Sequence, residues 1–240
     1  MANSAERSFM FVPKAVLFAL ALALTAQIAL RAANPPAIPK AIDLPSPPGS
    51  GVLSIASFGD PVPLAKLLML YLQAFDYQSG DRTPYQALDY KKLQIWLAQI
   101  LLLDPKGQYP LMAASRLYAD VPNESKKRQM LEFVYQEFIK DPNRRWQWLA
   151  HAAAVAKHGL KDLPLARKYA AAIQKYAQGD DVPLWARQME IFILEDMNEL
   201  ETARIMIGGY IEKGLIKSPG ELRTMEQRLK EIEARMRRGK

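Results

Sequence analysis

The two histidines, His151 and His158, are the side chains of this sequence best suited to hold a metal or to move a proton near neutral pH. Their spacing of seven residues puts both on one helix face, whereas a zinc site on a helix needs a spacing of four or additional ligands. The sequence contains no cysteine, which excludes disulfides, thiolate metal sites and cysteine nucleophiles together. We therefore interpret both imidazoles as partly buried or groove-lining side chains. A cofactor-binding, haem-binding or enzymatic role for His151 and His158 is the alternative.

Two further features have the residue types of a reaction centre without its spacing. Glu195, Asp196 and Glu199 fall at the end of a predicted helix, where solvated charge is expected rather than an acid–base pair. The pair Gly208-Gly209 lacks the preceding strand and the spacing of a phosphate-binding loop, so we expect a close approach of a neighbouring helix or an early helix end. The sequence thus favours a protein that is not an enzyme, with no catalytic residue, no metal site and no cofactor.

The elements that would position these residues are marked by prolines at near-regular intervals. Pro105, Pro142, Pro183 and Pro219 are 37, 41 and 36 residues apart, and each follows an aspartate or a serine closely. An aromatic residue follows each of the first three marks: Tyr109, Trp146 and Trp185. Two helix-length segments with apolar periodicity lie between successive marks, and no segment alternates β-branched residues as a strand does. A period of this length built from two helices is typical of helical-hairpin repeats, so the fold class is predicted to be all-α.

Helix starts and ends can be placed from capping residues and apolar periodicity. The predicted helices cover residues 60–75, 89–104, 109–118, 125–140, 144–158, 164–177, 184–197, 199–213 and 221–236. The helix from Arg144 is apolar almost all round, which requires neighbours on several sides. The last helix has one narrow apolar stripe on an otherwise charged surface, as a terminal capping helix needs.

The stretch from Arg144 to Gln178 resembles the tetratricopeptide-repeat superfamily in degenerate form. The residues that carry the resemblance are Trp146, Leu149, Ala150 and Ala153 in the first helix, and Ala166, Ala170 and Ile173 in the second. Leu200-Glu201-Thr202-Ala203 repeats the register of Leu163-Pro164-Leu165-Ala166, 37 residues further on. The resemblance implies a TPR-like antiparallel helical-hairpin solenoid, which binds a protein partner in a groove lined by first-helix positions.

Carrying the groove positions of that family onto this sequence gives candidates in three units. The candidate partner-binding residues are Arg144, Gln147, His151 and Glu190, with Pro110, Ala114, Leu117, Ala154, Ala186 and Ile193 at the remaining groove positions. Such a groove would be mixed and partly apolar, which suits a peptide or a helix better than a carboxylate clamp.

The N-terminal region differs in composition from the rest and divides the chain into three parts. Residues 1–30 form an apolar segment that we interpret as an uncleaved signal anchor, because no A-x-A cleavage site follows it. Residues 31–59 form a proline-rich spacer, in which residues 34–50 contain six prolines and are predicted to be extended. Residues 60–240 form the helical-repeat domain. A cleaved signal peptide, which would release a soluble periplasmic subunit, is the alternative.

The net charge of +7 is spread along the chain in clusters that alternate with acidic residues, which is typical of solvated helix faces rather than of a nucleic-acid footprint. We expect a single-pass inner-membrane protein, with the helical domain on the periplasmic side and the membrane contacted through the N-terminal helix. The sequence then predicts a scaffold or assembly protein that binds a protein partner of an envelope complex.

Overall fold

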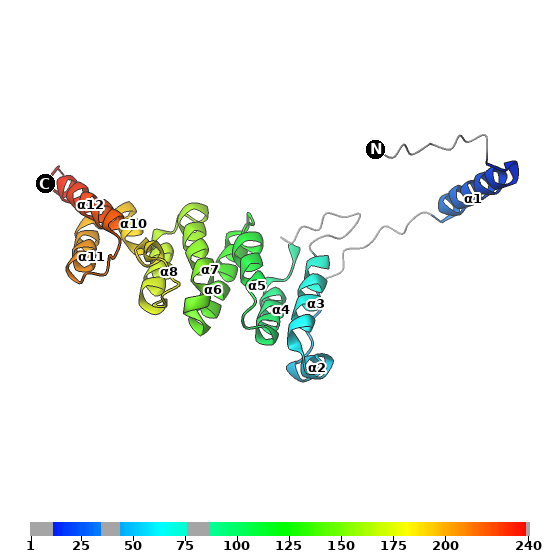
Figure 1. Cartoon of the computed structure of the whole chain (residues 1–240), viewed down its shortest axis with the longest axis horizontal. Coiled ribbons are helices and arrows are strands. Elements are labelled where there is room, and N and C mark those ends of the chain that lie inside the picture. The colour runs from blue at the N-terminus through cyan, green and yellow to red at the C-terminus, as the bar shows by residue number, and fades with distance from the viewer. Residues whose placement is uncertain (1–11, 35–43, 76–86, 239–240) are drawn as a thin grey trace, which may run out of the picture. The chain divides into compact units, whose positions relative to one another are not determined.

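The computed structural model describes residues 12–34, 44–75 and 87–238, and the secondary structure within these ranges is entirely helical. The chain divides into two compact units, one that contains the first helix and one that contains all the later helices. The elements of the second unit follow in chain order (Figure 1). They are α2 (Ser50–Ala56), α3 (Pro61–Ala74), α4 (Tyr90–Leu103), α5 (Tyr109–Met112), α6 (Glu124–Lys140), α7 (Pro142–Ala154), α8 (Leu163–Tyr176), α9 (Leu184–Arg187), α10 (Met189–Asp196), α11 (Leu200–Glu212) and α12 (Pro219–Arg238). Two π-helical segments, η3 (Ala113–Tyr118) and η4 (Val155–Gly159), continue α5 and α7.

The first unit contains the helix α1 (Lys14–Ala33), which is long and apolar enough to cross a membrane. Its 20 residues rise about 30 Å, which matches the hydrocarbon thickness of a bilayer. None of its residues is buried against other parts of the described chain. Residues 1–11, which include the start of the predicted apolar segment, lie outside the described residues.

Residues 44–59, which are assigned to the spacer by sequence, pack against the helical unit. Leu44 is 1% exposed, and the carbonyl of Pro45 accepts a hydrogen bond of 2.8 Å from Trp96 Nε1 of α4. Ser50–Ala56 form α2, whose Leu53 is also buried. Prolines exclude a helix only where they occur, and the last of them, Pro48, precedes α2. The helical unit therefore includes residues that the composition assigned to the spacer.

The helix starts follow the capping chemistry that the sequence predicts. The side chain of Asp60 accepts a hydrogen bond from Val62 N at 3.2 Å, and that of Asp89 accepts one from Lys91 N at 2.9 Å. Asn123 and Asp162 cap α6 and α8 in the same way. Proline occupies the first turn of α3, α5, α7 and α8, where its missing N–H costs no intrahelical hydrogen bond.

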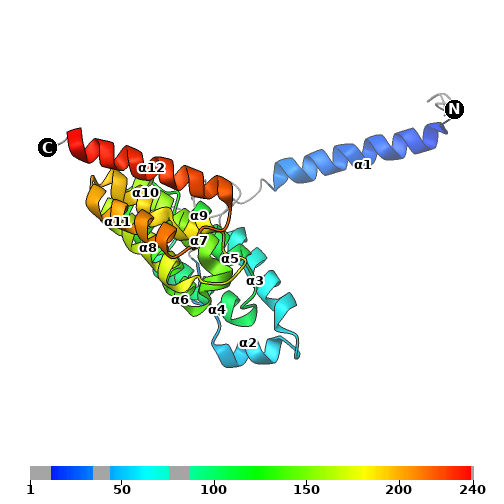
Figure 2. The same cartoon turned by 60° about the vertical axis from the view of Figure 1, so that its left-hand side comes forward.

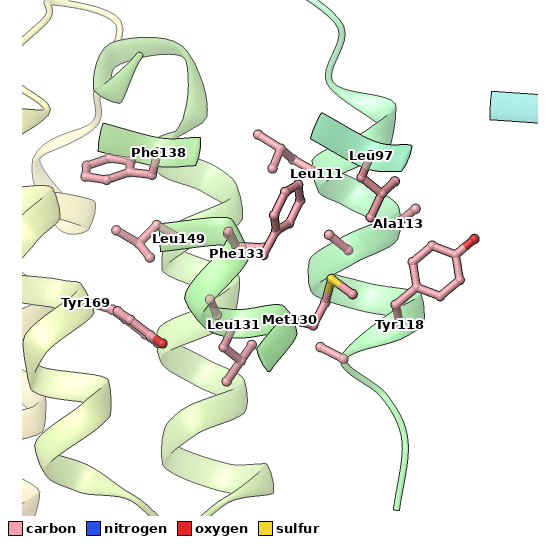
Figure 3. Close-up of a cluster of buried hydrophobic side chains, with 14 of the residues drawn as sticks. Leu97, Leu111, Ala113, Tyr118, Met130, Leu131, Phe133, Phe138, Leu149 and Tyr169 are labelled. Atoms are coloured by element: carbon pink, nitrogen blue, oxygen red, sulfur yellow. The ribbon is translucent and has the colours of Figure 1, made fainter. Parts of the chain in front are cut away.

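Each longer helix of the second unit packs against the one before it, from α3 to α12. One apolar core runs from Leu44 to Ile193, and its middle part is built by α4 to α8 (Figure 3). The side chains that fill this middle part include Leu97, Leu111, Tyr118, Met130, Phe138, Leu149 and Tyr169. A second core joins α10, α11 and α12, with α12 lying alongside both (Figure 2). Met225 and Ile232 of the predicted apolar stripe are buried there, while most of the remaining surface of α12 is exposed and charged.

Four helical stretches in the described part of this unit end with a hydrogen bond that spans five residues. The N–H groups of Ala119, Leu160, Glu199 and Leu215 donate to carbonyls five residues earlier, at 3.0, 3.1, 2.9 and 3.1 Å. The first two close the π-helical segments η3 and η4, whereas the last two follow residues with positive φ, Asn198 and Gly214. The first three closures lie 41 and 39 residues apart, at the ends of the stretches from α5, α7 and α10, which pair with α6, α8 and α11 as three hairpins.

Arginine–carboxylate pairs connect the second helices of these hairpins. Arg128 of α6 contacts Asp162, the capping residue of α8, at 2.6 Å. Arg167 of α8 contacts Glu199, which precedes α11, at 3.1 Å. The pairs are half-exposed, so each contributes little stability. Both connect the second helix of one hairpin to the start of the second helix of the next.

Two details of α9 to α11 correct the sequence-based expectations. The predicted helix over residues 184–197 is interrupted at Gln188, which is buried and separates α9 from α10. Gly208 and Gly209 lie inside α11, which continues to Glu212, so they do not end the helix. A Cβ atom added to either glycine would meet no atom within 4 Å, so a close helix approach does not explain them.

Candidate functional site

An apolar groove of 480 Å³ lies between α3 and the start of α5. Ala65 and Met69 of α3 and Ile100 of α4 are buried, while Leu70 at the edge is 66% exposed. Lys66 and Asp104 are the charged residues that line it. A groove of this volume with few polar groups suits an apolar side chain or a short helical segment of another molecule.

The wall of the groove on the α5 side is held by a tight turn. Gly107 N donates to Asp104 O at 3.0 Å, and a Cβ at Gly107 would lie 2.9 Å from Asp104 Oδ2. A larger residue at this position would force the Asp104 carboxylate to move. Tyr109 follows the turn, and its hydroxyl accepts a hydrogen bond from Gln73 Nε2 of α3. This contact joins the two walls of the groove at one end.

The three aromatic residues that follow the first three proline marks form an accessible set, which we call the aromatic row: Tyr109, Trp146 and Trp185. Tyr109 is 45% and Trp185 50% exposed, and Trp146 is partly buried. The rings of Trp146 and Trp185 meet edge to face, with centroids 5.4 Å apart and planes at 76°. Half-exposed aromatic rings supply large contact area with little loss of side-chain freedom on binding.

Gln108, the residue before Tyr109, connects the groove to α7. Its Oε1 accepts hydrogen bonds from Trp148 Nε1 at 2.7 Å and from Gln147 Nε2 at 3.2 Å. Gln147, one of the candidate partner-binding residues, is exposed and contacts Gln108, which lines the groove. Arg144, one turn earlier on α7, is also exposed and forms an ion pair with Asp141 at 3.0 Å. The structure thus places two of the four candidate residues beside the aromatic row.

His151 lies one turn beyond Gln147 on α7 and is partly buried. Burial lowers the pKa of His151 below its ordinary value of 6.5, and the positive charge of Arg116 acts in the same direction. Asp120 acts against them by raising that pKa. The imidazole is therefore neutral at physiological pH, where it can donate or accept a hydrogen bond but carries no charge.

Glu190 is not available at the surface. It is 7% exposed, and its Oε1 lies 3.1 Å from Arg167 Nε of α8. Three other predicted groove positions, Ala114, Ala186 and Ile193, are buried in the core. Pro110 is also buried, but it lines the groove between α3 and α5. The accessible positions of the predicted groove are Arg144, Gln147, His151, Leu117 and Ala154.

Of the three carboxylates expected to be solvated, Asp196 and Glu199 have side chains 41% and 39% exposed, whereas that of Glu195 is 11% exposed, and all three are paired with other helices. Glu195 contacts Arg228 of α12 at 2.5 Å, Asp196 contacts Lys157, and Glu199 contacts Arg167. These pairs connect helices and leave the three carboxylates without a common site. Within the described ranges, no group of three histidine, aspartate or glutamate residues is arranged to hold a metal ion.

The helix α3 was not identified from sequence as part of a groove, although the apolar composition of this helix pointed to it. The 14 residues of α3 contain one charged residue, Lys66, so the helix has more apolar surface than one neighbour can cover. Leu67 and Leu70 remain 62% and 66% exposed on it. Together with the groove, these side chains form an exposed apolar surface on this helix.

Comparison of the chain with protein-family models, with curated proteins and with solved structures gave no match in any of the three.

Proposed function

We propose that this protein is a membrane-tethered, TPR-like scaffold whose helical-hairpin solenoid binds a protein partner of an envelope complex. The five-residue closures that recur 41 and 39 residues apart and the serial contacts between consecutive hairpins support a repeat architecture. The helix α1 supports a single-pass membrane anchor. The proposal places this anchor in the inner membrane and the helical unit on the periplasmic side, because an N-terminal anchor commonly carries the domain that follows it across the membrane. Tethering confines the unit to the membrane surface and raises its effective concentration near membrane partners.

The observation that carries the proposal is the uneven covering of the two ends of the helical unit. At the C-terminal end, α12 covers the apolar faces of α10 and α11 and turns a charged surface outward. At the other end, α3 leaves Leu67, Leu70 and Tyr71 exposed next to the apolar groove. Repeat arrays are soluble when a polar helix caps each end, so the face of α3 that the described residues leave exposed is the natural place for a partner helix.

The aromatic row extends this surface toward α7 and α9. Tyr109 lines the groove, Gln108 contacts Gln147, the residue after Trp146, and Trp146 contacts Trp185. In the proposed complex, an apolar helix of the partner packs on α3 and in the groove, and a neighbouring segment of the partner contacts the aromatic rings. Aromatic anchors beside an apolar pocket are the usual source of most binding energy in such interfaces.

The test is site-specific photocrosslinking of the full-length chain in native membranes. A photoreactive phenylalanine analogue at Leu70 is expected to trap a partner protein, whereas the same analogue at Arg223, exposed on α12, is the matched control. The variant Leu70→Glu should then abolish co-purification of that partner. Equal trapping at both positions, or an unchanged yield of partner with Leu70→Glu, contradicts the proposed surface.

Topology requires a separate measurement. The mass of the mature protein distinguishes an anchor, which retains the N-terminal segment, from a cleaved signal peptide, which does not. Protease added to spheroplasts should digest the helical unit and leave the membrane helix protected. Resistance of the helical unit in intact spheroplasts would place it on the cytoplasmic side instead.

A further inference from the structure

A second groove, of 690 Å³, lies between α8 and α11 and is separate from the surface described above. Gln174 and Lys175 of α8 line one side, and Ile205 and Gly209 of α11 line the other. The hydroxyl of Tyr210 accepts a hydrogen bond from Gln174 Nε2 at 3.1 Å and donates one to Arg187 O at 3.0 Å. These bonds join α8, α9 and α11 around the groove. The groove lies on second helices of the hairpins, whereas the aromatic row lies at the start of first helices.

The charged residues that line this groove are all basic: Lys175, Arg187, Lys213 and Lys217. None of the four takes part in an ion pair within the described part of the chain, where many other arginines and lysines do. The Nη2 of Arg187 donates to Gly179 O and Val182 O, but its buried Nε has no acceptor among the described residues. Lys175 Nζ lies over the ring of Tyr176, 4.9 Å from its centroid, which leaves its charge without a carboxylate partner among the described residues. Cations around a concave surface attract carboxylates more strongly than the same charges on a flat surface.

The rim of the groove is apolar. Ile205 is 61% and Leu215 is 51% exposed, and Met206 and Leu184 are partly buried beside them. A small anion such as free phosphate would leave these side chains in water. A segment with both acidic and apolar side chains satisfies the cations and covers the rim together.

The two consecutive glycines of α11 differ in their relation to this groove. Gly209 lines it, whereas Gly208 does not, and neither has an atom within 4 Å of an added Cβ. Glycine lowers the stability of a helix relative to most residues. Because the space around both glycines is open, packing among the described residues does not explain why glycine occurs here. At Gly209 the missing side chain keeps the groove open and lets a bound segment approach the backbone of α11.

We propose that the groove between α8 and α11 binds an acidic, amphipathic peptide segment of a partner protein. The apolar side chains of the segment cover Ile205 and Leu215, and its carboxylates face Lys175, Lys213 and Lys217. Because Leu184 and Arg187 belong to α9, which also bears Trp185, a partner that extends across α9 can occupy this groove and the aromatic row together. The inference rests on the lining of the groove itself and holds whether or not α3 binds a partner.

The first test uses the two glycines as a matched pair. The probe is a fluorescein-labelled peptide of about four helical turns with glutamates and leucines at helical spacing, added to the full chain in non-ionic detergent. The variant Gly209→Leu should fill the groove and weaken binding of the peptide by at least about tenfold, measured by fluorescence anisotropy. The control Gly208→Leu gains the same helix former in the same helix and should bind the peptide as the unmodified chain does. Equal affinities of the two variants would overturn the proposal.

The second test addresses charge. The double variant Lys213→Glu with Lys217→Glu should weaken binding, whereas Lys230→Glu on α12 should not, and affinity should fall as salt rises from about 50 to 300 mM. A counterpart peptide with lysine at every glutamate position should not bind, and its binding at similar affinity would contradict the proposal. Displacement of the acidic peptide by phosphatidylglycerol added to the micelles, dependent on Gly209, would assign the groove to lipid headgroups and overturn the peptide assignment.

Discussion

Replacing Arg145 by methionine is expected to be among the most destabilising single changes outside the apolar core. The side chains of Arg145 and Glu137 are 4% and 5% exposed, and Nη1 of Arg145 lies 2.9 Å from Oε2 of Glu137. The same guanidinium donates to the carbonyls of Glu137 at 2.7 Å and of Pro105 at 3.2 Å. One arginine therefore connects the end of α6, the start of α7 and the Asp104-Pro105 turn.

The expected loss of stability follows from the carboxylate of Glu137, which stays buried after Arg145 is replaced. Removing one partner of a buried ion pair costs about 3–5 kcal/mol, because the other charge stays buried without its partner. Lys140 lies 2.5 Å from the other oxygen of Glu137 and still compensates part of that charge. The expected loss for Arg145→Met is therefore at the lower end, about 3 kcal/mol, which lowers the folding equilibrium constant about a hundredfold.

The assay is urea unfolding of the full chain in non-ionic detergent, followed by tryptophan fluorescence. Arg144→Met is the matched control, because Arg144 is exposed and its pair with Asp141 should contribute less than about 1 kcal/mol. The double variant Glu137→Leu with Arg145→Met should be more stable than Arg145→Met alone, since no buried charge then remains unpaired. A loss below about 1 kcal/mol for Arg145→Met, or strictly additive losses in the double variant, would refute this reasoning.

Three further outcomes are expected from the structure. In an NMR titration, His151 should show a pKa below 6.5, which Arg116→Gln should raise and Asp120→Asn should lower further. Because the folded-state pKa of His151 is depressed, its contribution should reduce stability as the pH falls from 6.5 through the folded value, and a pKa above 6.5 would contradict the assignment. Leu149→Ala should cost about 2–5 kcal/mol in urea unfolding, because Leu149 is 0% exposed between packed helices, and a loss under about 1 kcal/mol would show that the site collapses without a cavity. Gly107→Ala should be destabilising by thermal unfolding, because its Cβ would lie 2.9 Å from the Asp104 carboxylate, and an unchanged midpoint would mean that this side chain moves away freely.

The helices and their starts were largely predictable from sequence because they depend on local chemistry. Asp60 and Asp89 cap helices in the structure as their side chains and the following residues predict. The apolar stripe of α12 faces α10 and α11 as its spacing requires. The interruption at Gln188 was not predictable, because a buried glutamine inside an apolar segment carries no helix-ending signal.

The candidate site was predictable in part, for a geometric reason. Gln147 and Arg144 are exposed on α7, as their assigned positions require, and their role in binding a partner stays a prediction. The equivalent positions Ala114 and Ala186 are buried, because α5 and α9 are single turns whose continuations differ from α7. The exposed face of α3 depends on which neighbours are present, and periodicity alone does not contain that information.

The five-residue hydrogen bonds at Ala119, Leu160 and Glu199 affect how the hairpins can change in length during evolution. A turn closed over five residues holds one residue more than an α-helical turn, so a single insertion or deletion there can be absorbed before the next helix starts. Hairpins of unequal length can then keep the same position for their second helices, as the near-regular spacings of 37, 41 and 36 residues between proline marks illustrate. Alignment of the hairpins by backbone geometry should therefore reveal a regularity that alignment at a fixed residue period misses.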